Sequence, residues 1–476
     1  MNKNEELKEL VLSETPWVGD AQSESEQRKA LASFFDENKM EMILTRATNK
    51  LRKLQHSDGS FSWWEGMNGN FYMTMAVTKM LTRLQIMIGE NRTRPEILVK
   101  AFRYLDNEVT KRVEKLKERE RKGEKDILPS DALCDYLYTN ALAQRAHTSE
   151  TDYLVGLLSK ASTVLSIYGK ANVAIILAQY GFNQKANEYL ESMRQYTVYK
   201  EEMGRYFDTP RATYSWFDYR IPSQVAAIEA LRKLVPKDTL FINEMQRWLL
   251  QAKRTQAWGT PINTVDAIWA FANNGEMAQL NNNDSASSLS LDGKEITTSN
   301  SAGLGYVCYK ESLQSIPQIL SVEKYTRGSS WGAVYGQYFQ PMSEVQSASA
   351  GFAINRELLN RDGTPALAPK VGDRVCVRIT IEADRDYDFV TVEDKRAACL
   401  EPVIQRSGYR WGYYLEPRDY ATRYYFDQMK KGKHVIETEY YVDREGDYLS
   451  GTCTVQCAYS SEFSGRTIGT HVVVKK

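Results

Sequence analysis

The stretch that decides the fold runs from Gln55 to Gly66 and reads Q-H-S-D-G-S-F-S-W-W-E-G. Helical patterns of apolar residues lie on both sides of it. The loop joins a turn signal, Asp58-Gly59, to three large aromatic residues, Phe61, Trp63 and Trp64. Burial of one aromatic side chain is favourable by roughly 2–3 kcal/mol. We therefore expect this loop to fold back into a core or to line a cavity.

The composition is that of a neutral, packed globular protein. The 476 residues include 61 Lys and Arg and 61 Asp and Glu, so the net charge is zero. Nucleic-acid binding is not expected, because it requires an excess or a stripe of basic residues. The six cysteines form no C-x-x-C pair and have no histidine near two of them, so neither a metal site nor a cofactor is predicted. Cys453 and Cys457 lie four residues apart on one face of an expected strand, which favours two buried thiols over a strained disulfide.

The chain shows no membrane or export signal. No apolar run approaches the roughly 18–20 residues that span a bilayer. The first residues, 1–6, contain no apolar signal core. This pattern indicates either a cytosolic protein or a chain whose true N-terminus has been removed.

From about residue 28 to 275 the apolar spacing is helical. Three successive apolar faces comprise Met40, Ile43, Leu44, Ala47, Leu51 and Leu54; Met73, Val77, Met80, Leu81, Leu84 and Met87; and Leu98, Phe102, Leu105, Val109, Val113 and Leu116. Further helices are expected at 130–146, 151–167, 170–180, 184–195, 222–234, 238–252 and 261–273, separated by breakers such as Gly169. About ten helices with mostly short connections are typical of antiparallel helix pairs.

The opening loop has two weaker copies, around 204–216 and 257–260, each of which lies between two expected helices. Such repetition predicts helical hairpins stacked side by side. Closed into a ring, they form an α/α toroid. Trp216 and Trp258, in these copies, join Phe61, Trp63 and Trp64 as a candidate aromatic face, which either plugs the ring or forms a carbohydrate platform. We favour the plug, because the loops that carry these residues each lie between buried helices.

After residue 275 the apolar period changes to two. A small hairpin is expected at 289–296 and strands at 305–309, 319–325 and 331–339. Strands at 375–381, 434–442, 452–459 and 468–474 indicate an antiparallel β-sandwich. The predicted organisation is an N-terminal segment with a truncated toroid start at 1–27, a toroid at 28–277, a β segment at 278–345 and a β-sandwich at 346–476.

Several stretches carry a family pattern. They are Leu10–Val18 with Gln55–Gly66 in the helical part, and Val371–Val375, Asp384–Val390, Ser407–Trp411 and Ala458–Phe463 in the sandwich. Together they resemble the α-2-macroglobulin family of bacterial cell envelopes. The resemblance implies a thioester-domain-like toroid, the second part of a CUB-like β domain and a terminal macroglobulin-like domain, MG10. It also implies a non-enzymatic protease trap of the periplasm or cell envelope. The partners implied are proteases, which act through a full-length parent, and upstream macroglobulin-like domains.

The chain departs from the family at its covalent chemistry. Many members carry a C-x-E-Q thioester, and this sequence has none. Cys399-Leu400-Glu401-Pro402 lacks the glutamine, and Cys134 is followed by Asp135-Tyr136-Leu137. In the family the thioester lies upstream of the Leu10–Val18 segment. The parent therefore either carries a thioester outside this chain or belongs to the branch that lacks one.

Other toroid proteins give the alternative functions. Terpene cyclases need an acidic D-x-D-D cluster and prenyltransferases a zinc site, and neither pattern is present. A polysaccharide lyase could use His56, Tyr72 and Arg205 as base and uronate-neutralising groups, so a carbohydrate-binding or lyase-type toroid is the alternative. In the sandwich, a dense aromatic cluster makes Tyr413 or Tyr414 the candidate for contact with another domain.

Overall fold

The computed structural model describes residues 37–88, 95–161, 165–209, 212, 219–256, 258, 260–272, 287–296, 317–325, 332, 334–336 and 338–476. The described residues fall into two compact units. One holds those from 37 to 331 apart from 252–257, and the other holds 332–476 together with the described residues of 252–257. The predicted domain limits, at 27, 277 and 345, stay predictions.

The first unit is built from helices, as the periodicity predicts. Ten are described: α3 (Glu37–Lys53), α4 (Phe71–Ile88), α5 (Glu96–Arg121), α6 (Asp131–Leu142), α7 (Ser149–Lys160), α8 (Ile167–Gln179), α9 (Asn183–Arg194), α10 (Arg220–Leu234), α11 (Thr239–Thr255) and α12 (Pro261–Ala272). A short hairpin, β1 (Thr197–Lys200) and β2 (Gly204–Phe207), separates α9 from α10. Among the described helices, none is long and apolar enough to cross a membrane.

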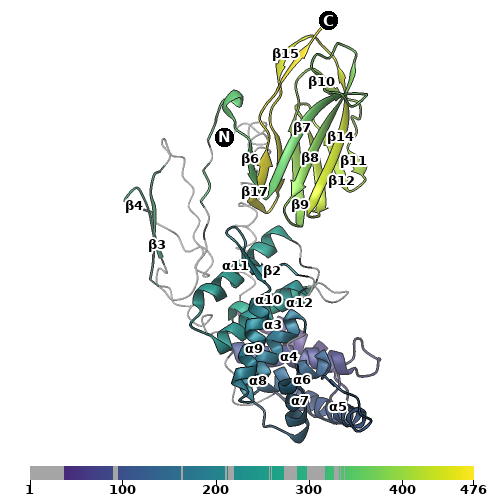
Figure 1. Ribbon diagram of the computed structural model, residues 1–476, viewed down its shortest axis with the longest axis vertical. Coiled ribbons are helices and arrows are strands. Elements are labelled where there is room, and N and C mark those ends of the chain that lie inside the picture. Colours follow the sequence, from purple (N-terminus) through teal and green to yellow (C-terminus); the bar gives the residue numbers. More distant parts are fainter. Residues whose placement is uncertain are drawn as a thin grey trace. The chain divides into compact units, whose positions relative to one another are not determined.

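Alternate helices form an inner row (Figure 1). Contacts run in succession from α4 to α6, α8, α10 and α12, while α5 packs on α4, α7 on α8, and α9 on both α8 and α10. The inner helices α8 and α10 are buried over most of their surface. This alternation is what stacked helical hairpins produce. Closure into a complete toroid stays a prediction.

The sequence prediction for α4 was wrong about its buried face. Leu84 is exposed, and the fully buried positions include Thr74, Thr78, Thr82 and Arg83. Each threonine hydroxyl donates to the carbonyl four residues earlier, at 2.6–2.8 Å. Because these hydroxyls are satisfied inside the helix, they can be buried at little cost. The apolar pattern therefore could not reveal the inner face.

Two further helical predictions need correction. Gly169 does not separate helices, because α8 begins at Ile167 and Ser166 caps it by accepting the Gly169 N–H at 3.1 Å. In α3, Ala47 is exposed and Leu51 is half-buried, so the apolar face is not fully covered at these two positions. The face of α5 is confirmed, since all six of its predicted apolar residues are buried.

The Gln55–Gly66 loop is anchored at its centre. Phe61 is 0% exposed, its N–H donates to Thr74 Oγ1 at 2.8 Å, and it forms bridges with Gln55 and Asn70. The turn at Gly59 has φ +93°, and an added Cβ there would lie 2.1 Å from the Lys100 carbonyl oxygen. The loop therefore closes on the helices through Phe61, as predicted for this residue.

The region after α12 contains fewer strands than predicted. The hairpin is confirmed as β3 (Ser287–Leu291) and β4 (Lys294–Ile296), and β5 (Leu320–Lys324) adds to β3 to form a three-stranded sheet. The expected strand at 305–309 lies outside the described residues. The strand expected at 331–339 is wrong, because its described residues adopt no regular structure and Phe339 is fully exposed. Gly332 and Gly336 interrupt the short alternation there.

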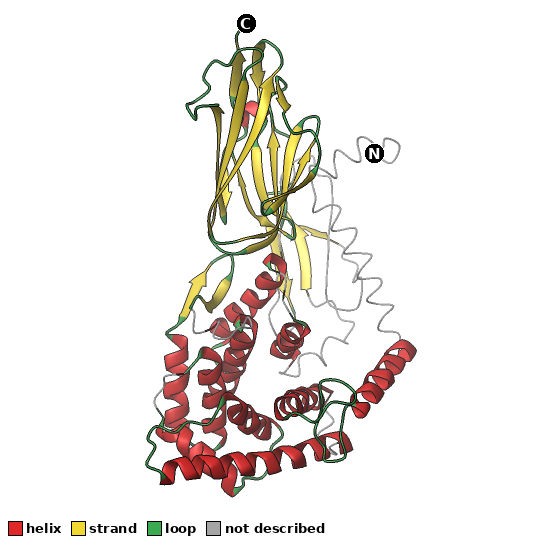
Figure 2. Cartoon of the chain, turned by 90° about the vertical axis from the view of Figure 1, so that its right-hand side faces the viewer, coloured by secondary structure: helices red, strands yellow, loops and turns green. Residues whose placement is uncertain are grey.

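The second unit is an antiparallel β-sandwich (Figure 2). Its strands are β6 (Ala348–Ala350), β7 (Phe352–Asn360), β8 (Arg374–Ala383), β9 (Tyr387–Lys395), β10 (Leu400–Pro402), β11 (Gly408–Arg410), β12 (Tyr413–Pro417), β13 (Ala421–Met429), β14 (Gly432–Val442), β15 (Gly446–Leu449), β16 (Cys453–Cys457), β17 (Ser460–Arg466) and β18 (His471–Val474). One sheet has the order β10-β14-β8-β7 and the other β11-β12-β13-β9-β16-β17-β6, and β15 pairs with β18.

The inward side chains of these sheets form the core. Val375, Val377, Ile379 and Ile381 of β8 are buried, as their alternation predicts. Cys453 and Cys457 are also buried and are free thiols, which confirms the sequence interpretation. Burial raises the pKa of Cys457 to about 11. Neither sulfur is therefore placed for thiolate chemistry.

Candidate functional site

The densest group of charges in the first unit lies between the inner helices. Arg83 of α4 donates to Asp266 of α12 at 2.6 Å and to the Tyr138 hydroxyl of α6 at 2.9 Å. Glu229 of α10 accepts from Tyr138 at 2.6 Å and from Trp269 Nε1 at 2.9 Å. All five side chains are buried. We call them the inner cluster.

The electrostatics of the inner cluster favour a charged arginine. Burial by itself would lower the pKa of Arg83, but Tyr138, Glu229 and Asp266 outweigh it and raise this pKa. One cation then faces two carboxylates, and the hydroxyl and indole N–H supply the remaining donors. The cluster joins four inner helices, and its atoms are enclosed. It therefore stabilises the helical unit, and nothing in it is presented to a substrate.

A second polar contact lies one turn earlier on α4. Lys79 lies 3.5 Å from Asp135 of α6, and Tyr168 of α8 donates to the same carboxylate at 2.7 Å. The sequence analysis missed both contacts. The sequence feature that could have revealed these contacts is the occurrence of Thr at every fourth position of α4 together with charged residues. A search for apolar periodicity does not detect such a pattern.

The aromatic loop does not plug the ring as predicted. Trp63 and Trp64 are 53% and 66% exposed, and their ring centroids lie 6.3 Å apart. Trp258 is half-buried, and Trp216 lies outside the described residues. The prediction was wrong for the tryptophan pair because Phe61 alone fills the buried position of this loop. The centre between the inner helices is filled by Tyr138, Trp269 and the charges around them.

The residues proposed for a lyase are not assembled for that chemistry. Arg205 donates to Glu244 at 2.7 Å, and its guanidinium lies 4.4 Å from the Phe241 ring centroid. Its charge is thus already neutralised by a neighbouring carboxylate. Tyr72 is largely exposed on α4. Within the described part of the chain, no group of three or more His, Cys, Asp or Glu is placed to hold a metal ion.

The sandwich presents an exposed aromatic surface, which we call the hairpin face. It consists of Tyr409, Trp411, Tyr414 and Tyr425. Strand register places Tyr409 opposite Tyr414, and Tyr414 opposite Tyr425. The Tyr409 and Tyr414 ring centroids are 5.6 Å apart in an edge-to-face arrangement. Trp411, in the turn between β11 and β12, is fully exposed.

Register also separates the two predicted candidates. Tyr413 points inward, with its ring centroid 5.6 Å from that of Tyr424 and 5.3 Å from that of Phe426. Tyr414 belongs to the outer surface. The aromatic residues that are clustered in the sequence thus lie on two opposite sides of one hairpin. Contact of either residue with another domain stays a prediction.

Hydrogen bonds fix the hairpin face on its strands. The Tyr409 hydroxyl donates to Asp427 at 3.1 Å, and the Tyr425 hydroxyl donates to Glu416 at 2.9 Å. Arg418 also donates to Glu416, at 2.6 Å. Because these groups are already bonded, the rings are held in place before any partner arrives. Aromatic residues held in this way are typical anchors of protein interfaces.

The sandwich is similar to a known protein family. Residues 351–462 match the family model of the bacterial alpha-2-macroglobulin MG10 domain. The predicted resemblance is confirmed. The hairpin face belongs to the matched segment, as does most of the two large sheets. The sandwich of this chain is therefore similar to the MG10 domain of bacterial alpha-2-macroglobulins.

Solved structures of alpha-2-macroglobulins also align with this chain, at low sequence identity. Trypsin-activated alpha-2-macroglobulin from Escherichia coli aligns over 90% of this chain and 29% of its own, with 13% identity and a TM-score of 0.44. Salmonella alpha-2-macroglobulin reacted with methylamine aligns over 90% and 27%, with 17% identity and a TM-score of 0.30. The native Escherichia coli protein from domain MG7 to the C-terminus aligns over 90% and 66%, with 15% identity and a TM-score of 0.29.

These alignments cover only part of each relative. The chain spans less than a third of the first and second structures. All three TM-scores are below 0.5, so the assignment rests on the MG10 match. No curated protein sequence matches the chain. The activity of the full-length relatives is therefore only proposed for this protein.

Proposed function

We propose that this chain is the C-terminal part of a macroglobulin-like protease trap of the bacterial cell envelope, without catalytic residues of its own. The observation that carries the proposal is the MG10 match over residues 351–462. Solved relatives are described as activated by trypsin or by porcine elastase, which fits a protein that responds to proteolysis. The proteases would act on the parent protein, and this chain would respond through its contacts with other domains.

The hairpin face supplies the surface for such a contact. Tyr409 is 68% exposed and Trp411 is fully exposed, so both offer apolar area that another domain would cover. Burial of about 100 Å² of apolar surface is worth roughly 2.5 kcal/mol. A few aromatic residues can therefore hold a domain in one state and release it in another. We propose that upstream macroglobulin-like domains are the partners of this face.

Covalent capture is not proposed for this chain. Cys134 is buried in α6, and burial raises the pKa of its thiol well above the ordinary value. Its sequence context also lacks the glutamine of a thioester. Steric trapping is the mechanism proposed here, and a C-x-E-Q segment elsewhere in the parent would add covalent capture to it.

The trap is tested with the full-length parent and trypsin. The complex is assayed with a small chromogenic peptide and with a large protein substrate. We expect cleavage of the peptide to persist while cleavage of the protein is lost, because a trapped protease remains active but shielded. Equal inhibition on both substrates, or none on either, would contradict the trap.

The hairpin face is tested in the same assay. Trp411→Ala with Tyr414→Ala should change the amount of protease that is trapped, because the contact between domains is weakened. Val435→Ala, an exposed apolar substitution on the other sheet of the sandwich, is the control. Trapping unchanged in the first variant would remove the hairpin face from the mechanism.

One observation favours a second function. Trp63, Trp64 and Tyr72 are all exposed, which suits stacking against sugar rings. Carbohydrate binding by the helical unit would be seen as quenching of tryptophan fluorescence by soluble glycans, lost in Trp63→Ala and Trp64→Ala. No quenching by neutral or uronic oligosaccharides would exclude this alternative.

A further inference from the structure

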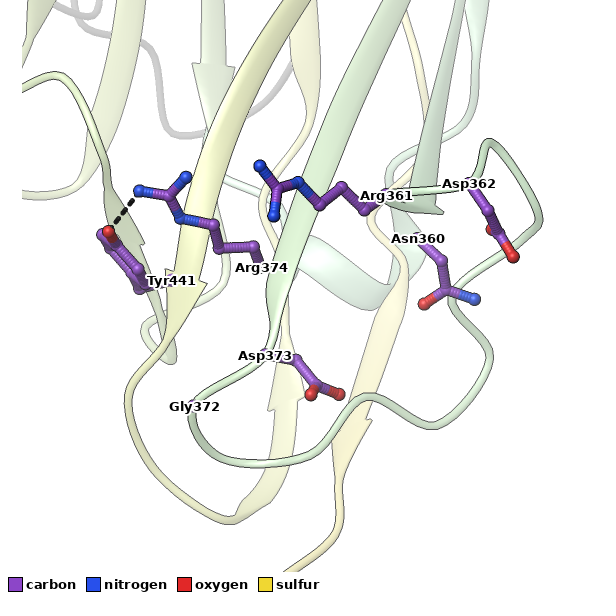
Figure 3. A pocket seen from close by; sticks show the side chains of 7 residues that line it. All are labelled: Asn360, Arg361, Asp362, Gly372, Asp373, Arg374 and Tyr441. Carbon is purple, nitrogen blue, oxygen red and sulfur yellow. Dashed lines mark hydrogen bonds between the residues drawn. The ribbon is translucent and has the colours of Figure 1, made fainter.

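We infer that one end of the four-stranded sheet is a binding site for a phosphate group, formed by Arg361, Arg374 and Tyr441. These side chains line a pocket of about 630 Å³ that also contains Asp362 and Asp373 (Figure 3). The site lies on the sheet opposite the one that carries the hairpin face, and it goes beyond the proposed trap. Three features of the sheet support this site: the strand positions of its residues, the hydrogen bonds of the nearby carboxylates and the geometry of its donors.

The three groups lie at one end of the sheet. Tyr441 of β14 lies opposite Arg374 of β8, and Asn360, the last residue of β7, lies opposite Val375. Arg361 follows Asn360 in the turn after β7, and it lines the same pocket as Arg374. Two like charges in one pocket repel each other. An anion bound between them removes that repulsion.

The same face of the sheet contains a row in which the charges are balanced. Four residues further along β8, Arg378 lies opposite Glu357 of β7 and Glu437 of β14. Arg378 donates to Glu437 at 2.7 Å. A cation flanked by two carboxylates needs no external anion. Opposite Arg374, by contrast, β14 carries Tyr441 in place of a carboxylate, and the turn after β7 carries Arg361.

The carboxylates of the pocket are engaged elsewhere. Asp362 accepts from the Thr364 N–H at 3.0 Å and from the Thr364 hydroxyl at 2.6 Å. Asp373 accepts from the Lys370 N–H at 2.8 Å. Figure 3 shows both guanidinium groups on one side, with Asp362 and Asp373 away from them. The local turns hold these carboxylates, and among the described residues neither aspartate forms an ion pair with an arginine of the pocket.

The two arginines differ in their present contacts. Arg374 donates to the Tyr441 hydroxyl, its guanidinium carbon lies 4.7 Å from the Tyr441 ring centroid, and Glu439 is 3.8 Å away at the rim. These contacts orient Arg374 and leave further N–H donors. For Arg361, the described residues supply no hydrogen bond or ion pair. Its donors are therefore available to a ligand.

The donor set suits phosphate. A guanidinium presents a planar fork that matches two oxygens of a phosphate, and the Tyr441 hydroxyl has a proton to donate to a third. A phosphate offers enough oxygens to accept from both guanidinium groups and from the hydroxyl, whereas one carboxylate offers only two. The pocket is larger than an inorganic phosphate, so the ligand is either a free phosphate compound or the headgroup of a phospholipid.

The experiment uses the full chain at constant ionic strength. Inorganic phosphate and pyrophosphate are titrated by calorimetry, and vesicles of phosphatidylglycerol with phosphatidylcholine are tested by co-sedimentation against pure phosphatidylcholine. Arg361→Gln and Arg374→Gln are compared with Arg378→Gln, the matched control on the same face. Each of the first two should weaken binding about tenfold, the effect of one lost charged hydrogen bond, and the control should leave it unchanged.

The outcomes distinguish a soluble phosphate ligand, a lipid headgroup and the absence of a phosphate site. Saturable binding of phosphate or pyrophosphate that is lost in Arg361→Gln and Arg374→Gln supports a soluble ligand. Binding to phosphatidylglycerol vesicles with the same loss, but none to free phosphate, supports a lipid headgroup. Absence of binding in both arms overturns the inference, and so does binding that Arg378→Gln weakens as much as the other two. Circular dichroism of each variant verifies that the sandwich is folded.

Discussion

Replacement of Arg83 by methionine is the sharpest test of the inner cluster. Methionine keeps the unbranched apolar stem of the side chain but removes its charge and its donors. Asp266 then loses the one hydrogen-bond donor that the described residues give it, at 2.6 Å, while Glu229 keeps Tyr138 and Trp269. An uncompensated buried charge costs about 3–5 kcal/mol. We therefore expect Arg83→Met to lower the free energy of unfolding of the helical unit by that amount, mostly through Asp266.

The assay is urea denaturation followed by far-ultraviolet circular dichroism, whose signal comes mainly from the ten helices. The matched control is Arg83→Met combined with Asp266→Asn, which removes the stranded charge together with the arginine. This double variant should recover at least half of the loss, because a buried pair replaced as a pair is far less costly than one broken pair. A loss below about 1 kcal/mol in Arg83→Met, or no recovery in the double variant, would refute the reasoning.

Three other predictions also use urea denaturation, followed by circular dichroism for the helical-unit variants and by the tyrosine fluorescence of the sandwich for Asp394→Asn. Phe61→Ala should cost about 3–5 kcal/mol because its ring is fully buried, while Trp64→Ala should stay within about 0.5 kcal/mol. Gly59→Ala should cost at least about 1 kcal/mol, since φ is +93° and the backbone leaves no room for a methyl group. Burial raises the pKa of Asp394 in the folded protein, despite its ion pair with Arg356 at 2.9 Å. The contribution of Asp394 to the free energy of unfolding is therefore complete below the pKa of the unfolded state, and it is lost as the pH rises through the pKa of the folded state. The stability of the wild type relative to Asp394→Asn should therefore decline from about pH 4 towards neutrality, and a constant difference would contradict this.

Periodicity predicted most of the fold. The six apolar residues of α5 and the four of β8 are buried where the pattern placed them. In both elements one face meets a core and the other meets solvent, so hydrophobic spacing carries the information. The loop at Phe61 and the change of period after the last helix were predicted for the same reason.

The inner face of α4 and the tryptophan pair could not be predicted in this way. On α4 the buried side chains include three threonines, whose hydroxyls bond carbonyls of the same helix, and an arginine, whose carboxylate partner is remote in the sequence. At 63–64, apolar composition alone did not decide exposure, because Phe61 already occupies the buried position. The arginine pocket of the sandwich was also missed, since it forms only through the pairing of three strands.

The inner cluster also sets an order of events for the growing chain. Arg83 and Asp266 are 183 residues apart, so the arginine is synthesised long before its carboxylate partner. Contacts of such long range form late, because the entropy of closing the intervening chain must be overcome first. A ribosome-bound or truncated chain that ends before Pro261 lacks this partner, and chaperones should bind it longer than a chain that includes α12. An expression fragment of the helical unit should therefore extend through Ala272.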